Sequence, residues 1–226
     1  MIVATNPNIT LINDDSVYMS REVADFWRPV DRTEALVDGH LSTEVYKEMF
    51  LTLWQRYKNQ TKHSLNDFTG FAFHLPYTKM GKKSLDQIIL EADEAQQKRL
   101  LNNLIASQQF SRHVGNLYTG SVYLSFLSLL SNSKDLKPGE KVAIFSYGSG
   151  AEAELYSMTL QPDFRSSIPA ASVAKQLSER QQVSVAQYEK IFQSQLLDSH
   201  VDVIRSATKK HHFQFLGWQN GERQYS

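Results

Sequence analysis

The amino-acid sequence predicts a layered α/β fold. Short runs of β-branched and aromatic residues, which are typical of strands, alternate with longer stretches of helical periodicity. One predicted helix, over residues 119–130, has apolar side chains on nearly every side, and a helix of that kind is buried all round. Together these observations favour an architecture in which a central helix is sandwiched between sheets.

The first elements expected are a strand region and a helix. Residues 2–12 are apolar and rich in β-branched side chains, which indicates a strand region. Residues 41–57 should form a helix that Ser42 or Thr43 can cap. On one face of this helix, apolar side chains recur at every fourth position (Val45, Met49, Leu53 and Tyr57).

The middle of the chain contains a buried strand and a broken helix. Residues 71–75 are short and apolar, and the strand is expected to end at His74 or just beyond, because Pro76 follows. Residues 84–104 have a helical composition with a break near Asp93.

Two further strands, residues 141–147 and 151–160, flank a tight loop at 148–150, and residues 169–174 are expected to be loop-like. Ser184 and Gln187 fit a capping box, which opens a helix that continues to residue 196. Near the end, residues 213–216 (FQFL) and 224–225 (QY) flank Asn220-Gly221, and Asn-Gly is a strong hairpin signal.

Composition excludes several classes of protein. Of 226 residues, 24 are Lys or Arg and 24 are Asp or Glu, so the chain as a whole does not match nucleic acid or an anionic membrane. It lacks an apolar run long enough to span a membrane and a signal peptide at its start, so a cytoplasmic protein is expected. The chain has no cysteine, which excludes disulfides, thiolate metal sites and a cysteine nucleophile within it. No metal or cofactor motif is found, so neither group is expected.

Three short stretches contain residues suited to chemistry. His74, at a strand end, can act as a general acid or base, or it can be a core histidine with a satisfied hydrogen bond. Lys79, Lys82 and Lys83 can bind phosphate or form a solvated basic turn. Asn116 can cap the apolar helix or aim its amide at a substrate carbonyl. The Gly-Ser-Gly loop at 148–150 can bring backbone N–H groups to a ligand or be a plain turn.

Taken together, these stretches resemble a known family. Residues 73–83 (FHLPYTKMGKK) are similar to the histidine motif of bacterial hydroxymethylglutaryl-CoA synthases, and residues 115–125 (GNLYTGSVYLS) resemble the asparagine motif of that family. Residues 145–150 (FSYGSG) resemble its glycine-serine loop, and the stretches DFWRP and VDG, at 25–29 and 37–39, follow the same order. The resemblance extends over essentially the whole chain.

The resemblance implies a thiolase-like fold, of which this chain is the C-terminal half, and a homodimer when the protein is complete. Residues 1–12 resemble the end of the N-terminal thiolase-like half, and residues 13–226 resemble the C-terminal domain. The implied reaction condenses acetyl-CoA with acetoacetyl-CoA to give hydroxymethylglutaryl-CoA in the mevalonate pathway. A cysteine nucleophile and a general-base glutamate carry out its first steps, and both belong to the N-terminal half.

The resemblance also assigns roles to residues of this chain. His74 matches the histidine that binds and polarises the acetoacetyl-CoA carbonyl, and Asn116 matches the asparagine that hydrogen-bonds the substrate carbonyl.

Ser149 and Gly148 match the loop that lines the acyl site, and Lys79 and Lys83 match lysines near the phosphates or pantetheine of CoA. The CoA thioesters are expected as substrates, not as cofactors.

Three functional hypotheses remain open from sequence. The chain is a fragment of the synthase that is inactive alone, or it is one subunit of a split synthase whose cysteine-bearing half is another chain. The third hypothesis is a non-catalytic CoA-binding module. Each hypothesis accommodates the absence of a thiol nucleophile, which a histidine cannot replace in this acyl transfer.

Overall fold

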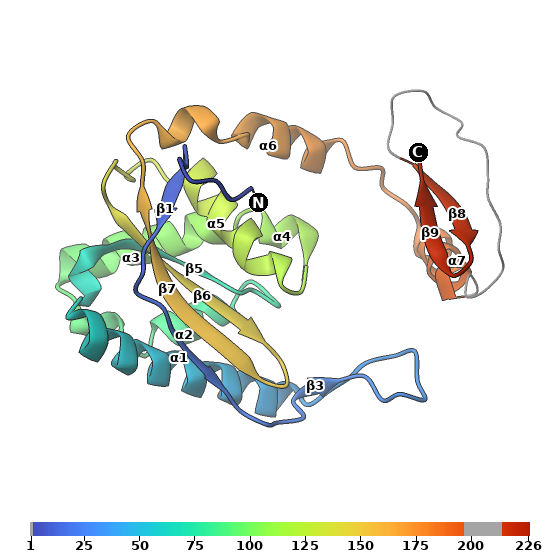
Figure 1. Ribbon diagram of the computed structural model, residues 1–226, viewed down its shortest axis with the longest axis horizontal. Helices are drawn as coiled ribbons and strands as arrows, with labels where there is room; N and C mark the ends of the chain where they lie inside the picture. The colour runs from blue at the N-terminus through green and yellow to red at the C-terminus, as the bar shows by residue number, and fades with distance from the viewer. Residues whose placement is uncertain (1, 197–213) are drawn as a thin grey trace. The chain divides into compact units, whose positions relative to one another are not determined.

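The computed structural model describes residues 2–196 and 214–226 (Figure 1). The residues up to Ser178 form one compact unit, and Glu179–Ser226 belong to a second. None of the helices in the described part of the chain combines the length and the apolar surface that crossing a membrane requires.

The first unit is built on a five-stranded sheet. Its strands are β1 (Thr10–Ile12), β2 (Val17–Ser20), β5 (Phe68–Phe73), β6 (Lys141–Gly148) and β7 (Glu152–Leu160). The order is β1-β7-β6-β5, and β2 pairs with β7 beside β1. Only β5 and β6 are parallel, and the other pairs are antiparallel. The carboxyl ends of β5 and β6 therefore meet at the same edge of the sheet.

Helices cover both faces of this sheet (Figure 1). Successive side chains of β6 alternate between the faces: Phe145 belongs to the core beneath α1 (Gly39–Thr61), whereas Ile144 belongs to the core beneath α5 (Gly120–Asn132). The helix α3 (Glu94–Gln108) packs against both α5 and β5. This layered arrangement confirms the predicted α/β class.

The helix α1 begins at a different cap from the one predicted. Its apolar repeat is confirmed, because all four side chains at that spacing are buried. The N-cap is Asp38, whose Oδ1 accepts a hydrogen bond from the N–H of Leu41 at 3.0 Å. The prediction that Ser42 or Thr43 caps the helix was wrong, because both residues lie inside its first turns.

The predicted break at Asp93 is confirmed. Asp93 caps α3 by accepting a hydrogen bond from the N–H of Gln96 at 2.9 Å. The region before it is the short helix α2 (Met80–Leu85) followed by the 3₁₀ turn η2 (Ile89–Glu91). Another 3₁₀ turn, η1 (Leu65–Asp67), precedes β5.

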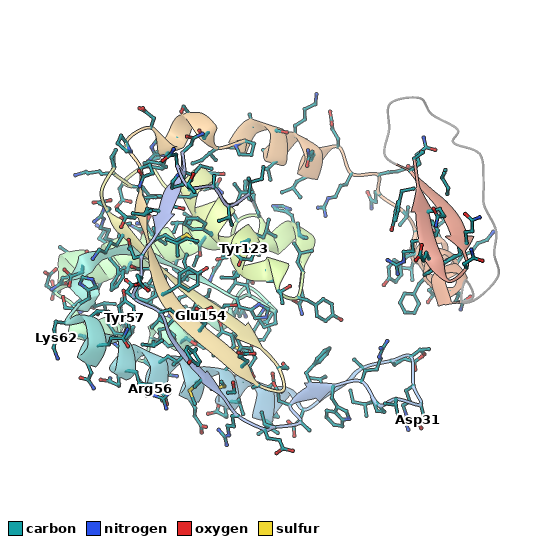
Figure 2. The ribbon with its side chains drawn as sticks, viewed as in Figure 1. Asp31, Arg56, Tyr57, Lys62, Tyr123 and Glu154 are labelled. Carbon is teal, nitrogen blue, oxygen red and sulfur yellow. The ribbon has the colours of Figure 1, made fainter. Side chains whose placement is uncertain are left out.

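The helix α5 is buried on the side that faces the sheet and partly open on the other. Its approach to β5 is close, since a Cβ on Gly70 would lie 3.3 Å from a methyl carbon of Leu129. On the other side Tyr123, labelled in Figure 2, is 39% exposed, and Leu124 and Leu127 are half-buried. The prediction that this helix is buried on every side is therefore confirmed only for the side that faces the sheet.

Three further short elements belong to the first unit. The helix α4 (Ser111–Val114) precedes α5, and β3 (Phe26–Trp27) pairs antiparallel with β4 (Leu36–Val37). Asp31, labelled in Figure 2, lies on the exposed loop between these two strands.

The stretch expected to be loop-like at 169–174 is helical, and that prediction was wrong. The 3₁₀ turn η3 (Phe164–Ser167) leads into α6 (Ala170–Ser178), and the N–H of Val173 donates to the carbonyl of Pro169 at 2.9 Å. Proline is well suited to a helix start, and alanine is the strongest helix former, so small residues alone did not indicate a loop.

The described residues of the second unit form a helix and a hairpin. The capping box at α7 (Val185–Leu196) is confirmed, because the N–H of Ser184 and the side chain of Gln187 bond at 2.8 Å, with the reciprocal bond at 3.2 Å. The strands β8 (Phe215–Gln219) and β9 (Glu222–Tyr225) form the predicted hairpin, with positive φ at both residues of the Asn-Gly turn. Residue 213 of the predicted strand lies outside the described residues.

Replacing the cap of α1 tests the corrected helix boundary. We expect Asp38→Ala to lower the free energy of unfolding by about 1 kcal/mol, because the N–H of Leu41 loses its acceptor. Urea denaturation measures the change, with Asp31→Ala as the control on the exposed loop. An Asp38→Ala variant as stable as the Asp31→Ala variant would show that this cap contributes nothing.

Candidate functional site

His74 lies directly after β5, at the edge of the sheet where β5 and β6 both end. Its N–H donates to the carbonyl of Phe145 at 2.8 Å, which extends the pairing with β6 by one residue. Its own carbonyl accepts a hydrogen bond from the hydroxyl of Tyr46 at 2.6 Å. The main chain of His74 is thus held from both sides.

The imidazole of His74 is buried, with 7% of the residue exposed. Its Nδ1 is buried and has no hydrogen-bond partner among the residues that the structure describes. Burial lowers the pKa of His74 from 6.5 to about 4, so the ring is neutral at neutral pH. The satisfied hydrogen bond expected of a core histidine is therefore not found in this part of the chain. A neutral imidazole has one nitrogen that donates and one that accepts.

The carboxylate of Asp25 holds the loop after β6 in place by hydrogen bonds. This residue is fully buried, and its carboxylate accepts hydrogen bonds from the hydroxyl of Tyr147 at 2.9 Å and from the N–H of Gly150 at 3.1 Å. Burial by itself raises the pKa of Asp25, but hydrogen bonds from Tyr147, Ser149, Ser42 and Gly150 bring it below its ordinary value. An ionised carboxylate therefore supports the loop that contains Gly148 and Ser149.

Tyr147 connects this loop to His74. Burial, followed by the hydrogen bond to Asp25, raises the pKa of Tyr147 well above its usual range, so its hydroxyl stays protonated and donates. Its ring centroid lies 6.2 Å from that of His74. The structure thus brings together the predicted residue His74 and the predicted loop. Sequence analysis did not single out Asp25 as a functional residue; the signal available was an acidic side chain directly before Phe-Trp.

Asn116 is exposed and closes the turn before α5. Its Oδ1 accepts hydrogen bonds from the N–H of Tyr118 at 2.8 Å and from the hydroxyl of Ser121 at 3.0 Å. Because these two donors occupy Oδ1, the amide NH₂ of Asn116 is the group left to donate to another molecule. The interpretation of Asn116 as the cap of the helix was wrong, because the N-cap of α5 is Thr119 and neither donor to Asn116 is a backbone N–H of the helix. The amide-donor interpretation stays a prediction.

The turn that contains Asn116 connects to the rest of the site through aromatic rings. Tyr118 lies edge-to-face against Phe26, with 6.4 Å between the ring centroids. Phe26 directly follows Asp25 in the chain, so the segment that supports the glycine-serine loop also contacts the asparagine turn. The connection from Asn116 to His74 is therefore indirect.

The three lysines after His74 differ in what they contact. Lys82 forms an ion pair with Asp86 at 2.7 Å. Lys83 donates to the hydroxyl of Tyr77 at 2.9 Å and lies 5.4 Å above the ring of that residue. Lys79 is exposed, and its ammonium has no partner among the described residues. Lys79 is therefore the lysine of the three most available to an anion.

The phenol of Tyr77 is altered by these neighbours. Burial tends to raise its pKa, but hydrogen bonds with Lys83 and Thr43 lower it below the ordinary value. Lys83 thus stabilises the ionised form of Tyr77, and the ammonium of Lys83 is already hydrogen-bonded to this phenol.

The burial of His74 predicts a dependence of stability on pH. The pKa of this histidine is 6.5 when unfolded and about 4 when folded, so the unfolded state binds more protons between those values. Above about pH 6.5 the neutral imidazole of His74 costs the folded state nothing in proton binding. As the pH falls, the free energy of unfolding decreases, and the total loss is roughly 3 kcal/mol below about pH 4. We expect His74→Gln to remove this part of the pH dependence.

The measurement is the free energy of unfolding by urea at about pH 7 and at about pH 4.5. His40→Gln, at an exposed position of α1, is the control and should retain the full loss on acidification. If His74→Gln and the unchanged chain lose equal stability on acidification, His74 is not held neutral by burial.

Comparison with known proteins identifies the family to which this chain is similar. A family model described as the C terminal of hydroxymethylglutaryl-coenzyme A synthase matches residues 13–108 and 95–213. A hydroxymethylglutaryl-CoA synthase of Enterococcus faecalis is 40% identical over 202 residues, which are 89% of this chain and 52% of the relative. Hydroxymethylglutaryl-CoA synthase B of Dictyostelium discoideum is 32% identical over 68% of this chain and 42% of the relative.

Solved structures agree with the sequence relatives. A crystal structure of HMG-CoA synthase complexed with CoA has a TM-score of 0.88 at 36% identity, over 97% of this chain and 57% of that chain. This chain spans about half the length of the relatives that it matches. The described fold and the matched residues show that the chain belongs to the hydroxymethylglutaryl-CoA synthase family, whose C-terminal region it carries.

Proposed function

We propose that this chain forms the acetoacetyl-CoA side of a hydroxymethylglutaryl-CoA synthase active site. The reaction condenses acetyl-CoA with acetoacetyl-CoA, consumes one water and gives hydroxymethylglutaryl-CoA and free CoA. Two related structures support a ligand of the CoA class. One is complexed with CoA itself, and the other, MvaS, is in complex with the thioester 3-hydroxy-3-methylglutaryl coenzyme A, at a TM-score of 0.79 and 26% identity.

The observation that carries the proposal is a buried, neutral His74 next to a loop that an ionised Asp25 holds in place. In the condensation, an enolate carbon attacks the ketone carbonyl of acetoacetyl-CoA, and negative charge develops on the carbonyl oxygen. A neutral imidazole N–H can donate a hydrogen bond to that oxygen and so stabilise the developing negative charge. The amide NH₂ of Asn116 supplies a second donor for a substrate carbonyl.

The nucleophile has to come from residues outside these 226. The family's first step forms an acetyl thioester on a cysteine, and this chain has none. A thiolate is both a good nucleophile and a good leaving group, which an imidazole is not in this acyl transfer. We propose that a cysteine-bearing thiolase-like half, in the same polypeptide or in a second chain, supplies the thiol and the general-base glutamate.

Exposed apolar side chains indicate where that half binds. On the first unit, Leu11 and Ile12 of β1 are each 49% exposed, and Tyr123 on α5 is exposed as well. Exposed apolar side chains that gather into one contiguous patch are typical of surfaces that another protein covers. We propose that the cysteine-bearing half packs against β1 and the open side of α5, so that residues 1–12 form the junction between the halves.

We propose that Lys79 binds a phosphate of CoA. Of the three lysines after His74, it is the one whose ammonium has no partner among the described residues. Lysine binds phosphate as a point charge. Lys83 is committed to Tyr77, so we propose that it acts on the pantetheine arm through this phenol and not on a phosphate.

The proposed function is tested by product formation. The 226-residue chain is mixed with acetyl-CoA and acetoacetyl-CoA, alone and with the cysteine-bearing half, and hydroxymethylglutaryl-CoA is detected by mass spectrometry. We expect product only in the mixture. Product from the chain alone would refute the requirement for a second source of thiol. CoA binding without product in the mixture would identify a non-catalytic CoA-binding module instead.

The lysine assignment is tested by affinity. We expect Lys79→Ala to weaken acetoacetyl-CoA binding by roughly fivefold to tenfold, or about 1 kcal/mol, because one phosphate contact is lost. Isothermal titration calorimetry on the mixture measures the dissociation constant. Lys82→Ala, three residues away and paired with Asp86, is the matched control and should change little. Equal effects of the two changes would count against Lys79.

A further inference from the structure

The imidazole of His74 lacks the hydrogen-bonding partner that usually fixes such a ring. In catalytic histidines one ring nitrogen commonly donates to a carboxylate or a backbone carbonyl, and this bond sets the tautomer and the orientation. In the described residues the buried Nδ1 of His74 has no such partner. Its orientation must therefore come from its main chain and from the side chains packed around it.

Tyr46 is the side chain that holds the main chain of His74. It lies on α1, is fully buried and donates from its hydroxyl to the carbonyl of His74 at 2.6 Å. Burial raises the pKa of Tyr46, and the nearby phenols of Tyr147 and Tyr77 raise it further, so the hydroxyl remains a donor. The backbone N–H of His74 donates in turn to the carbonyl of Phe145, so the main chain of His74 is held from both sides.

The ring of Tyr46 also supports the wall beside the imidazole. Its centroid lies 4.9 Å from that of Tyr147 and 5.1 Å from that of Phe145. Tyr147 is the residue whose ring lies beside His74, and its hydroxyl is anchored on Asp25. Tyr46 therefore contacts the backbone of His74 with its hydroxyl and the neighbour of the imidazole with its ring.

We propose that Tyr46 is a positioning residue that aims the imidazole of His74 at the substrate carbonyl. The inference rests on the proposed function, in which His74 donates to that carbonyl. Condensation requires the donor and the reacting oxygen at hydrogen-bond distance, and a misplacement of about 1 Å can reduce a rate by about two orders of magnitude. Loss of the Tyr46 hydroxyl leaves a buried carbonyl without its donor and releases one of the two bonds that fix the backbone of His74.

A purely structural role predicts a different pattern, and the chain contains a matched case. Tyr57 is also buried on α1, and its hydroxyl donates to a carboxylate oxygen of Asp15 at 2.6 Å (Figure 2 labels Tyr57). Asp15 in turn binds Ser157 on β7, on the part of the sheet where β1 and β2 pair. Tyr57→Phe therefore removes a comparable tyrosine hydroxyl of the same helix, whose part-buried hydrogen bond goes to Asp15 and not to His74.

The test compares Tyr46→Phe with Tyr57→Phe in the full 226-residue chain. Proton–carbon NMR of the histidine side chains follows the imidazole of His74, which His74→Gln assigns by the signal that disappears. We expect Tyr46→Phe to shift this signal and to move its titration toward that of an exposed histidine, while Tyr57→Phe leaves both unchanged. A variant carrying 4-aminophenylalanine at position 46, which keeps the ring and a donor, should restore most of the original signal.

Activity of the complete system gives the second readout. With the cysteine-bearing half present, Tyr46→Phe should lower the condensation rate at saturating acetoacetyl-CoA by about tenfold and leave acetylation of the cysteine unchanged. An unchanged His74 signal and titration in Tyr46→Phe would overturn the proposal whatever the activity. A system in which the unchanged chain makes no product would contradict the proposed function, and the NMR comparison would still decide the role of Tyr46. If Tyr46→Phe does not fold, 4-fluorophenylalanine at position 46 replaces it, because this residue keeps the ring and removes the O–H donor. An unaltered His74 signal and titration in that variant would then overturn the proposal.

Discussion

The carboxylate of Asp25 is completely buried, and hydroxyl and N–H groups stabilise it by hydrogen bonds from Tyr147 and Gly150. A buried charge is strongly unfavourable without such bonds, so its donors are constrained to stay in place. The carbonyl of the same residue accepts a hydrogen bond from the N–H of Asp38, the cap of α1. Asp25 thus connects three parts of the first unit: the start of α1, the segment that contains β3 and the loop between β6 and β7.

The candidate site is buried and hydrogen-bonded around His74, whereas the turn that contains Asn116 is exposed. His74 is held by two main-chain bonds, and its neighbour Tyr147 is anchored on Asp25. Asn116 lies on an exposed turn that touches this core only through the rings of Tyr118 and Phe26. Under the proposed function, the imidazole that polarises the carbonyl is the one held in place, and the amide that donates to the substrate is the one exposed.

Features that depend on neighbours in sequence could be predicted from the sequence, and features that depend on distant segments could not. The repeat on α1, the break at Asp93 and the Asn-Gly hairpin are all set within a few residues. The bond from Tyr147 to Asp25 joins positions 122 residues apart, and nothing local distinguishes a buried aspartate from an exposed one. The resemblance located His74 and the lysines, but only the structure shows that Lys83 is occupied by Tyr77 and Lys79 is not.

The parallel pairing of β5 and β6 has a consequence for how the protein folds. His74 follows β5, the glycine-serine loop follows β6, and the helices α2 to α5 all lie between these two strands in sequence. Parallel strands require such a crossover, and contacts between residues far apart in sequence form slowly because a long loop must close first. His74 and the glycine-serine loop therefore come together only when the crossover has packed against the sheet. Assembly of the site is consequently inseparable from completion of the fold, and a partly folded chain has no preformed site that could bind substrate.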